Sequence, residues 1–139
     1  MILSHTCQVA IKSIACIVEN ETGCINVKEL AAITEENPHT IAKVLQNLVK
    51  AGMLSSVTGP HGGFMLSRKQ LAQPLIEIVK IVDGTDSFDN CVLGLKQCDA
   101  RHQCPVHEKY VPVRKEIRKI FAQTKLSQLA LIPELVKNF

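Results

Sequence analysis

Aromatic side chains are scarce in this chain of 139 residues, which contains no Trp and a single Tyr. The hydrophobic core must therefore be mainly aliphatic, and hydrophobic residues are plentiful enough for it at 46% of the sequence. The longest apolar runs fall far short of the roughly 20 residues that a membrane-spanning helix needs. A chain of this length is expected to form one domain, or one domain with an appended element.

The apolar N-terminal segment, MILSHTCQVAIKSIACIVEN, lacks the cationic start and the small-residue cleavage site of a signal peptide. We therefore expect a cytoplasmic protein with no membrane partner. In that reducing compartment the six cysteines would be metal ligands, reactive thiols or core residues rather than disulfides. The sequence shows no CxxC pair and no nucleophile–base arrangement, so neither an enzyme nor a small-molecule substrate is expected.

Three helices are predicted in the first third of the chain. The first runs from Ser4 to Glu19. Asn26 and Glu29 have the spacing of a capping box and open a short second helix. Asn37 caps a third helix, which begins with Pro38. The apolar stripes of the first and third helices are Leu3, Cys7, Ala10, Ile11, Ile14, Ile17 and Val18, and Ile41, Val44, Leu45 and Leu48.

A glycine-rich hairpin follows the third helix. Two β-prone segments, Met53 to Val57 and Phe64 to Leu66, flank the turn TGPHGG. The order of helix, short helix, turn, helix and hairpin is that of a winged helix-turn-helix. The predicted fold class is therefore mainly α with a small β-hairpin wing.

The outer face of the third helix is polar and fits the major groove of double-stranded DNA. Lys43 and Lys50 can meet phosphates or guanine edges, Gln46 can pair with adenine, and the helix N-terminus offers N–H groups to a phosphate. Any surface helix is polar outside, and the net charge is only +3, so the wing carries much of the argument: its glycines let the backbone approach a phosphate. The predicted DNA-binding residues are His39, Thr40, Lys43, Gln46, Lys50, Thr58, His61, Gly62 and Arg68.

Beyond a further helix, predicted from Pro74 to Asp83-Gly84, the C-terminal part repeats apolar residues in alternating steps of four and three. That average of 3.5 residues is typical of a seam between two helices. Pro112 interrupts the repeat, so the continuous helix is expected from about Pro112 to Thr124. A monomer would leave the stripe exposed, which favours a homodimer. The stripe consists of Val106, Tyr110, Val113, Ile117, Ile120 and Thr124.

The stretch CVLGLKQCDARHQCPVHEKY holds Cys91, Cys98 and Cys104, with gaps of six and five residues. Structural zinc prefers pairs spaced by two to four residues, whereas wide, even gaps suit an iron–sulfur core. Pro105 favours a helix start, which places His107 in the first turn, on the side of Cys104. Three possibilities remain open: an iron–sulfur cluster, which we favour, a zinc-stabilised winged-helix interaction module, and a metal-free thiol-redox regulator. The other cysteines, Cys7, Cys16 and Cys24, are expected in the core.

The hairpin SSVTGPHGGFMLSR, the order of elements and CPVHE preceded by two cysteines resemble the Rrf2 family of bacterial transcription regulators. The resemblance runs from the first helix through LSQLA. It implies a homodimeric winged helix-turn-helix repressor whose promoter affinity is controlled by an iron–sulfur cluster sensing redox state, nitric oxide or iron–sulfur status. It also implies the ligands: Cys91, Cys98 and Cys104, with His107 matching the fourth ligand of IscR-type members, for a 2Fe–2S or alternatively a 4Fe–4S cluster.

Some positions depart from the family's known members. Ala42 stands where IscR has a recognition-helix glutamate, and Thr58 stands where IscR has a wing arginine. Gln8 occupies the place of the acidic ligand that NsrR-like members take from the partner, with His5 and Cys7 nearby as alternative fourth ligands. The expected organisation is a winged helix-turn-helix in residues 1–83, a cluster-binding loop in residues 84–107, and a dimerisation helix with tail in residues 108–139.

Overall fold

Side-chain caps start the first three helices where the sequence predicts them. In the computed structural model, which describes residues 3–20, 23–96, 99 and 101–130, helix α1 spans His5–Glu19, α2 spans Val27–Thr34 and α3 spans Pro38–Lys50. The Cys7 N–H donates to Ser4 Oγ at 3.0 Å and the Glu29 N–H to Asn26 Oδ1 at 2.9 Å, so both predicted starts are confirmed. The rows of apolar residues then turn toward one core.

The inward face of α3 is the one that the sequence predicts. Its apolar residues are buried together with Ile14 of α1 and Leu30 of α2, in a cluster that also takes in Phe64 of the hairpin. Each fully buried aliphatic side chain contributes about 1.5–3 kcal/mol through removal from water, so this shared cluster fixes α3 against the body. The predicted inward residues of α3, all buried, are Ile41, Val44, Leu45 and Leu48.

The wing is a two-stranded antiparallel hairpin of β1 (Ser55–Val57) and β2 (Gly63–Met65). It is tied to the segment before α2 by a pair of backbone hydrogen bonds between Ile25 and Phe64, of 3.0 and 2.8 Å. Gly62 is required locally, because a Cβ there would lie 2.0 Å from the Val57 carbonyl oxygen. The hairpin can therefore close only with glycine at that position.

Two short elements after the wing were not predicted, namely α4 (Arg68–Leu71) and the 3₁₀ helix η1 (Leu126–Leu129). Helix α5 spans Ile76–Asp83, so the prediction that Pro74 begins it was wrong by two residues. Pro74 instead pairs with Lys125 in an isolated β-bridge. This long-range pairing, which the local sequence does not encode, seats the fully buried Leu126 in the main core.

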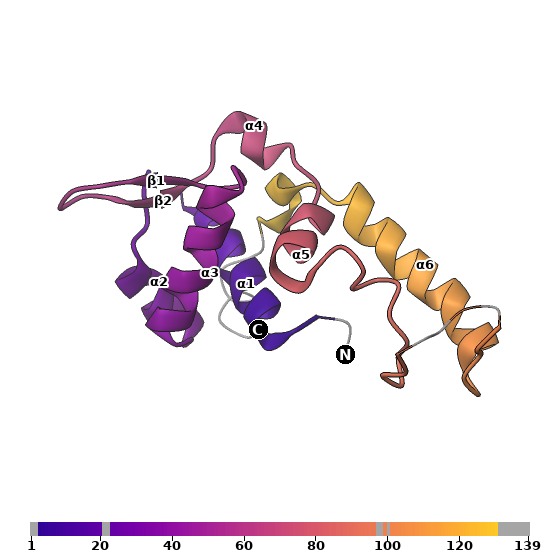
Figure 1. Ribbon diagram of the computed structural model, residues 1–139. Coiled ribbons are helices and arrows are strands. Elements are labelled where there is room, and N and C mark those ends of the chain that lie inside the picture. The colour runs from indigo at the N-terminus through magenta and orange to yellow at the C-terminus, as the bar shows by residue number, and fades with distance from the viewer. Residues whose placement is uncertain (1–2, 21–22, 97–98, 100, 131–139) are drawn as a thin grey trace.

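The long C-terminal helix α6 spans His107–Gln123 and contains Pro112, so the expected start near Pro112 was wrong. Proline removes one N–H and leaves the carbonyl four residues earlier, that of Glu108, without its helical donor. Glu108 and Pro112 are both exposed, so water can satisfy that carbonyl. Figure 1 shows α6 extending from the winged body, and the described part of the cysteine loop (residues 84–107) running from α5 toward the far end of α6. No helix within the described ranges is long and apolar enough to cross a membrane.

Candidate DNA-binding surface and cysteine loop

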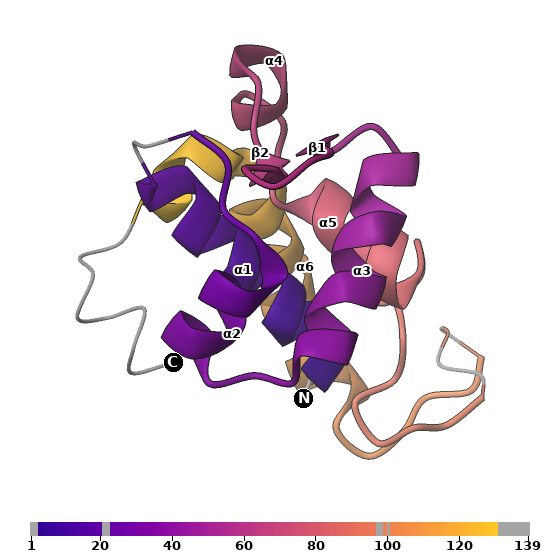
Figure 2. The same ribbon diagram turned by 90° about the vertical axis from the view of Figure 1, so that its left-hand side faces the viewer.

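The predicted DNA-reading side chains lie on the solvent side of α3. Lys43, Gln46 and Lys50 are exposed, as is His39 at the first turn, whereas Thr40 is half-buried. Figure 2 faces the side of the molecule on which α2 and α3 lie, with the hairpin above them. The helix thus offers two ammonium groups and an amide on a single surface, which suits phosphate and base-edge contacts.

The N-terminus of α3 differs from the prediction that its N–H groups are open to a phosphate. Asn37 Oδ1 already accepts hydrogen bonds from the N–H groups of His39 and Thr40, at 2.8 and 3.4 Å, and Pro38 carries no N–H. The cap therefore occupies the donors that the sequence suggested for a phosphate. Phosphate contacts on this helix are left to its side chains.

A pocket of about 300 Å³ lies between α3 and the ends of α1 and α5, beside the reading face. Thr6, Thr40, Lys43 and Asn47 bring hydroxyl, ammonium and amide groups to its wall, over an apolar floor. The sequence gave no sign that Thr6, which belongs to another helix, would reach this pocket.

The remaining predicted DNA-binding residues lie on and after the wing. Thr58 and His61 are exposed in the turn, and Arg68 is exposed at the start of α4. Gly62 is half-buried and its side without a Cβ faces the hairpin's own backbone. The structure therefore gives Gly62 a folding role, and its predicted DNA contact stays a prediction.

An ion-pair cluster joins α1 to the turn before α3. Lys12 Nζ donates to Glu36 Oε1 at 2.8 Å, and His5 Nε2 lies 3.2 Å from Glu36 Oε2. The hydrogen bond from Lys12, followed by the charges of Lys12 and His5, lowers the pKa of Glu36 below its ordinary value. Lys12 and Glu36 are both largely buried, so the pair holds the helix-turn-helix against α1.

The cysteine loop buries two of its thiols. Cys91 and Cys104 expose only 8% and 7% of their surface, although most residues between them are exposed. His107 lies in the first turn of α6, as predicted, although the helix begins at His107 itself rather than at Pro105, and the His107 N–H donates to the Cys104 carbonyl at 3.0 Å. Cys98 lies outside the described residues. Within the part of the chain that is described, no group of three His, Cys, Asp or Glu side chains forms a metal site.

The donor chemistry nonetheless fits a soft or borderline metal centre. Thiolates favour iron–sulfur clusters, copper and zinc, and imidazole is an accepted partner ligand. Cys91 and Cys104 are buried although the described residues between them are exposed, and His107 follows three residues after Cys104. Cys91, Cys98, Cys104 and His107 are thus the residues that could hold a cluster.

Arginines of α6 fasten the chain that leads into Cys91, a feature that sequence reasoning missed. Arg114 Nη1 donates to the carbonyl oxygens of Asp89 and Asn90, at 2.9 and 3.1 Å. Arg118 Nη1 lies 3.3 Å from an oxygen of the Asp89 carboxylate. Because these contacts join residues at least 24 positions apart, no local pattern could have revealed them.

The cysteines of α1 behave differently. Burial, with a smaller contribution from Asp83, raises the pKa of Cys7 to about 12. Burial together with the Glu19 charge raises the pKa of Cys16 to about 11. Both thiols are core residues, as predicted, and the high pKa of Cys7 opposes its use as an alternative thiolate ligand. Cys24 is only half-buried, so the prediction that it lies in the core is confirmed only in part.

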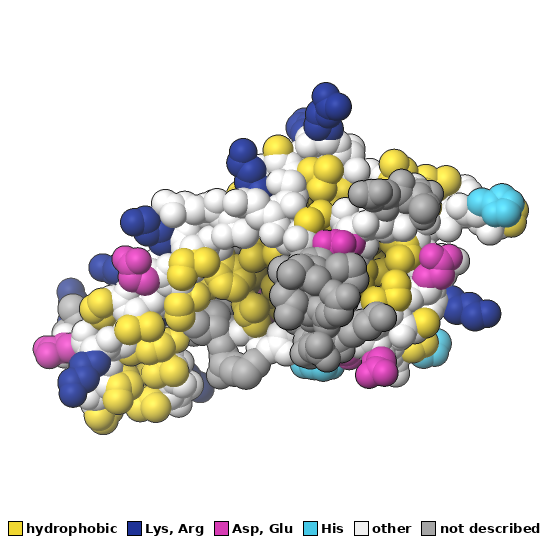
Figure 3. Space-filling model, turned by 180° about the vertical axis from the view of Figure 1, so that it is seen from behind, with side chains coloured by type: hydrophobic (Ala, Val, Ile, Leu, Met, Phe, Trp, Pro, Cys, Tyr) yellow, Lys and Arg dark blue, Asp and Glu magenta, His cyan; other side chains and the backbone are white. Residues whose placement is uncertain are grey.

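Helix α6, together with its N-cap residue Val106, carries an exposed apolar stripe. Val113 and Ile120 expose 51% and 60% of their surface, and Val106 is also exposed, so the three recur every seven residues. Ile117, from the same predicted seam, instead packs with Phe121 against the cluster around Cys7. Figure 3 shows hydrophobic side chains gathered on the left of the view, where α6 projects from the body. The predicted seam is therefore divided between the body and solvent.

Comparison with known proteins identifies the family. The Rrf2 model, described as an iron-dependent transcriptional regulator, matches residues 3–131. This chain belongs to the Rrf2 family. A predicted HTH-type transcriptional regulator of Aquifex aeolicus is 29% identical to this Rrf2 protein over 96% of the chain and 94% of the relative. IscR of Xenorhabdus nematophila is 28% identical over 78% of the chain and 64% of its own length.

Solved structures show that this Rrf2 protein shares its fold with CymR and with IscR. CymR, the global cysteine regulator of B. subtilis, has a TM-score of 0.73 at 17% identity, covering 92% of this chain and 95% of its own. IscR of T. potens has a TM-score of 0.68 at 18% identity, covering 91% and 84%. The predicted winged-helix fold is confirmed, and the chain is an Rrf2 transcriptional regulator.

Proposed function

We propose that this Rrf2 protein is a homodimeric repressor whose affinity for its DNA operator is controlled by an iron–sulfur cluster. Cys91, Cys98, Cys104 and His107 would hold the cluster, with the 2Fe–2S form favoured. The single observation that carries the proposal is the burial of Cys91 and Cys104 at the two ends of a stretch whose other described residues are exposed and which leads into α6. When bound, such a cluster supplies one-electron redox chemistry and reactivity toward oxygen or nitric oxide.

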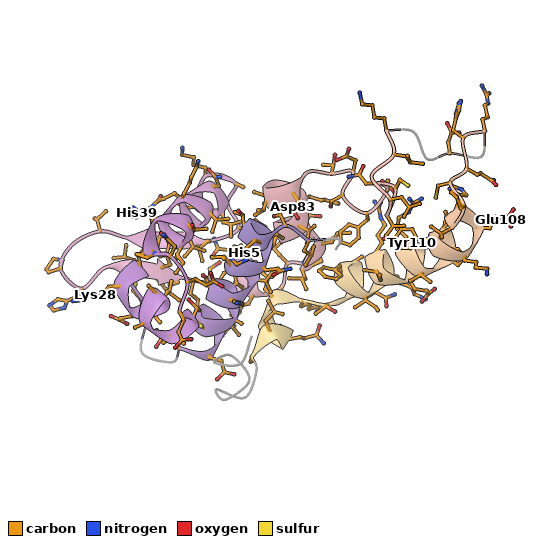
Figure 4. All side chains as sticks on the ribbon, turned by 90° about the horizontal axis from the view of Figure 1, so that it is seen from below. His5, Lys28, His39, Asp83, Glu108 and Tyr110 are labelled. Carbon is orange, nitrogen blue, oxygen red and sulfur yellow. The ribbon has the colours of Figure 1, made fainter. Side chains whose placement is uncertain are left out.

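The position of His107 supports its assignment as the fourth ligand. It is the first residue of α6, and the bond from its N–H to the Cys104 carbonyl closes the turn between them. An imidazole coordinates only when neutral, so protonation in acid would weaken its hold on a metal. His5, the alternative in α1, pairs with Glu36, and Figure 4 shows it far from the first turn of α6 where Glu108 and Tyr110 lie, so His5 could reach the cluster only from the partner subunit.

The apolar stripe of α6 supports the homodimer. Val106, Val113 and Ile120 lie seven residues apart, the spacing by which helices pair along a seam. A second copy of α6 would cover side chains that water surrounds in one subunit. The C₂ symmetry of such a pair would present two winged heads, as a palindromic operator requires.

Control of DNA binding would follow from the connection between the loop and the winged body. Helix α6 is attached at two places: Arg114, at its middle, binds the carbonyl oxygens of Asp89 and Asn90 in the loop, and Leu126 enters the main core just past the end of the helix. A change in the loop that moves α6 would therefore alter the angle between the two heads. Half-sites lie about one duplex turn apart, so a small rotation weakens simultaneous binding.

Anaerobic purification tests the proposal. We expect a coloured protein containing iron and acid-labile sulfide, which binds double-stranded DNA selected from the source genome with an affinity that changes after oxidation. Cys91→Ser should abolish the colour, and His107→Ala should alter the visible spectrum and hasten loss of iron. A colourless, iron-free protein, or a loaded protein whose DNA affinity ignores the cluster, would contradict the proposal.

The second candidate function is a metal-free thiol regulator, and one structural relative supports it. CymR of Staphylococcus aureus, solved also in an oxidized form, has a TM-score of 0.66 to this chain at 18% identity, covering 94% of this chain and 96% of its own. A reversible disulfide among Cys91, Cys98 and Cys104, forming as DNA affinity changes in iron-free protein, would establish this candidate instead. Stoichiometric zinc without sulfide and without DNA binding would favour a zinc-stabilised interaction module.

A further inference from the structure

The segment just before Cys91 is held by side chains of α6. Arg114 donates two hydrogen bonds from one guanidinium nitrogen, Nη1, to the carbonyl oxygens of Asp89 and Asn90. Those are the two residues that immediately precede Cys91. An arginine spanning two successive carbonyls fixes the direction of the chain that follows.

Two neighbouring contacts strengthen the same attachment. Arg118, one helical turn further along α6, pairs with the Asp89 carboxylate at 3.3 Å. The rings of Phe88 and Phe121 pack with centroids 5.3 Å apart, and Phe88 is buried. Three successive turns of α6 therefore each hold part of residues 88–90.

The opposite end of the loop is fixed by a different means. Cys104 lies three residues before the start of α6, and its carbonyl receives the His107 N–H. The positions of both buried cysteines therefore depend on α6. Cys104 is connected to the helix by the chain itself, and the residues before Cys91 are bound to it by side chains. The residues between them are mostly exposed and have no comparable attachment among the described contacts.

We propose that Arg114 is a positioning residue that presets Cys91 as a ligand by holding the carbonyls of Asp89 and Asn90 on α6. This inference rests on the proposed cluster-binding function. Arg114 itself touches no metal in this assignment. It fixes the position of the Cys91 thiol before a metal binds. Because Arg114 belongs to α6, the position of that thiol then depends on the position of α6.

The first test measures thiol reactivity in metal-free protein, kept reduced and treated with iodoacetamide, with each cysteine followed by mass spectrometry. Arg114→Ala should raise the alkylation rate of Cys91 about tenfold, which corresponds to about 1.4 kcal/mol of lost protection. Arg114→Lys should restore part of the protection, because an ammonium can still donate to one carbonyl. Lys115→Ala, which removes the same charge from the next, exposed position of α6, should match the wild type.

Internal references keep this measurement interpretable. Cys24, remote from the loop in sequence, should react equally in every variant. Cys7 and Cys16 should stay unmodified, since they are buried in the body, and their protection shows that the variant is folded. Unchanged Cys91 reactivity in a folded Arg114→Ala protein would overturn the inference.

The second test follows cluster loss in anaerobically purified protein exposed to a chelator. The visible absorption of Arg114→Ala should decay about tenfold faster than that of the wild type, with Arg114→Lys between them and Lys115→Ala unchanged. If the wild type loads a cluster and Arg114→Ala loses it at the same rate, the inference is wrong. If the wild type loads none, the proposed function fails, and the alkylation rates alone still decide whether Arg114 positions Cys91.

Discussion

Ile120 is the most exposed of the apolar residues on the outer stripe of α6, and its replacement by alanine tests whether that stripe is a subunit interface. Full burial of such a side chain is worth about 1.5–3 kcal/mol, so covering the 60% that is exposed would contribute about 1–2 kcal/mol per subunit. A symmetric dimer contains two copies, and Ile120→Ala should therefore weaken it by about 2–4 kcal/mol. The dimer dissociation constant should rise about 30- to 700-fold.

Sedimentation equilibrium over a range of protein concentrations measures this constant directly. Alanine has the higher helix propensity, so α6 itself should be preserved and the far-UV circular dichroism unchanged. Lys119→Ala is the matched control, because it shortens an exposed side chain on the neighbouring position of α6. A dissociation constant for Ile120→Ala within threefold of the wild-type value would show that the stripe does not mediate dimerisation.

Three further substitutions probe the body of the protein. Leu126→Ala should lower the free energy of unfolding by about 2–5 kcal/mol in denaturant melts, because this fully buried side chain fills the main core; a loss below about 1 kcal/mol would remove it from that core. Gly62→Ala should weaken DNA binding while leaving helix content intact, since its Cβ would lie 2.0 Å from the Val57 oxygen and cost about 1–3 kcal/mol of overpacking; unchanged operator affinity in a binding assay would contradict this role of the wing. Glu36→Gln should be less stable than the wild type at neutral pH. Because the pKa of Glu36 is lowered in the folded protein, its ion pair stabilises the fold at pH values above the ordinary glutamate pKa, and this stabilisation is lost as acid protonates the carboxylate. The melting temperatures of the two proteins should therefore converge at low pH. Melting temperatures that differ by the same amount at every pH would refute the pairing with Lys12.

Much of the winged body could be predicted because its signals are local. Asn26 and Asn37 sit before the helices that they cap, and the spacing of apolar residues in α3 gives its buried face directly. The hairpin is also visible in the sequence, as two β-prone segments separated by a glycine-rich turn. These features need information from fewer than ten consecutive residues.

The errors occur where distant residues decide the structure. Pro74 looks like a helix start, yet it pairs with Lys125 and α5 begins later. Pro112 looks like a break, yet α6 accommodates it on an exposed face near its N-terminus. The attachment of Asp89 and Asn90, just before the buried Cys91, to Arg114 of α6 is likewise a contact that the spacing of the cysteines does not reveal.

The candidate site was predicted as a set of residue types rather than as a geometry. The spacing of the cysteines named the donors, and the proline after Cys104 placed His107 at the start of a helix, as the structure has it. The attachment of the loop by Arg114 could not be inferred, because any exposed helix carries arginines. The pocket beside α3 was missed because Thr6 reaches it from a different helix.

The projection of α6 separates two kinds of chemistry within one small chain. Helix α6, seventeen residues and about 25 Å long, starts just after Cys104 and ends just before Leu126, which lies in the packed core. Substitutions at the thiol end leave the packing of the winged body untouched. Under the proposed function, substitutions around the cysteines would change the stimulus while the winged body keeps its shape.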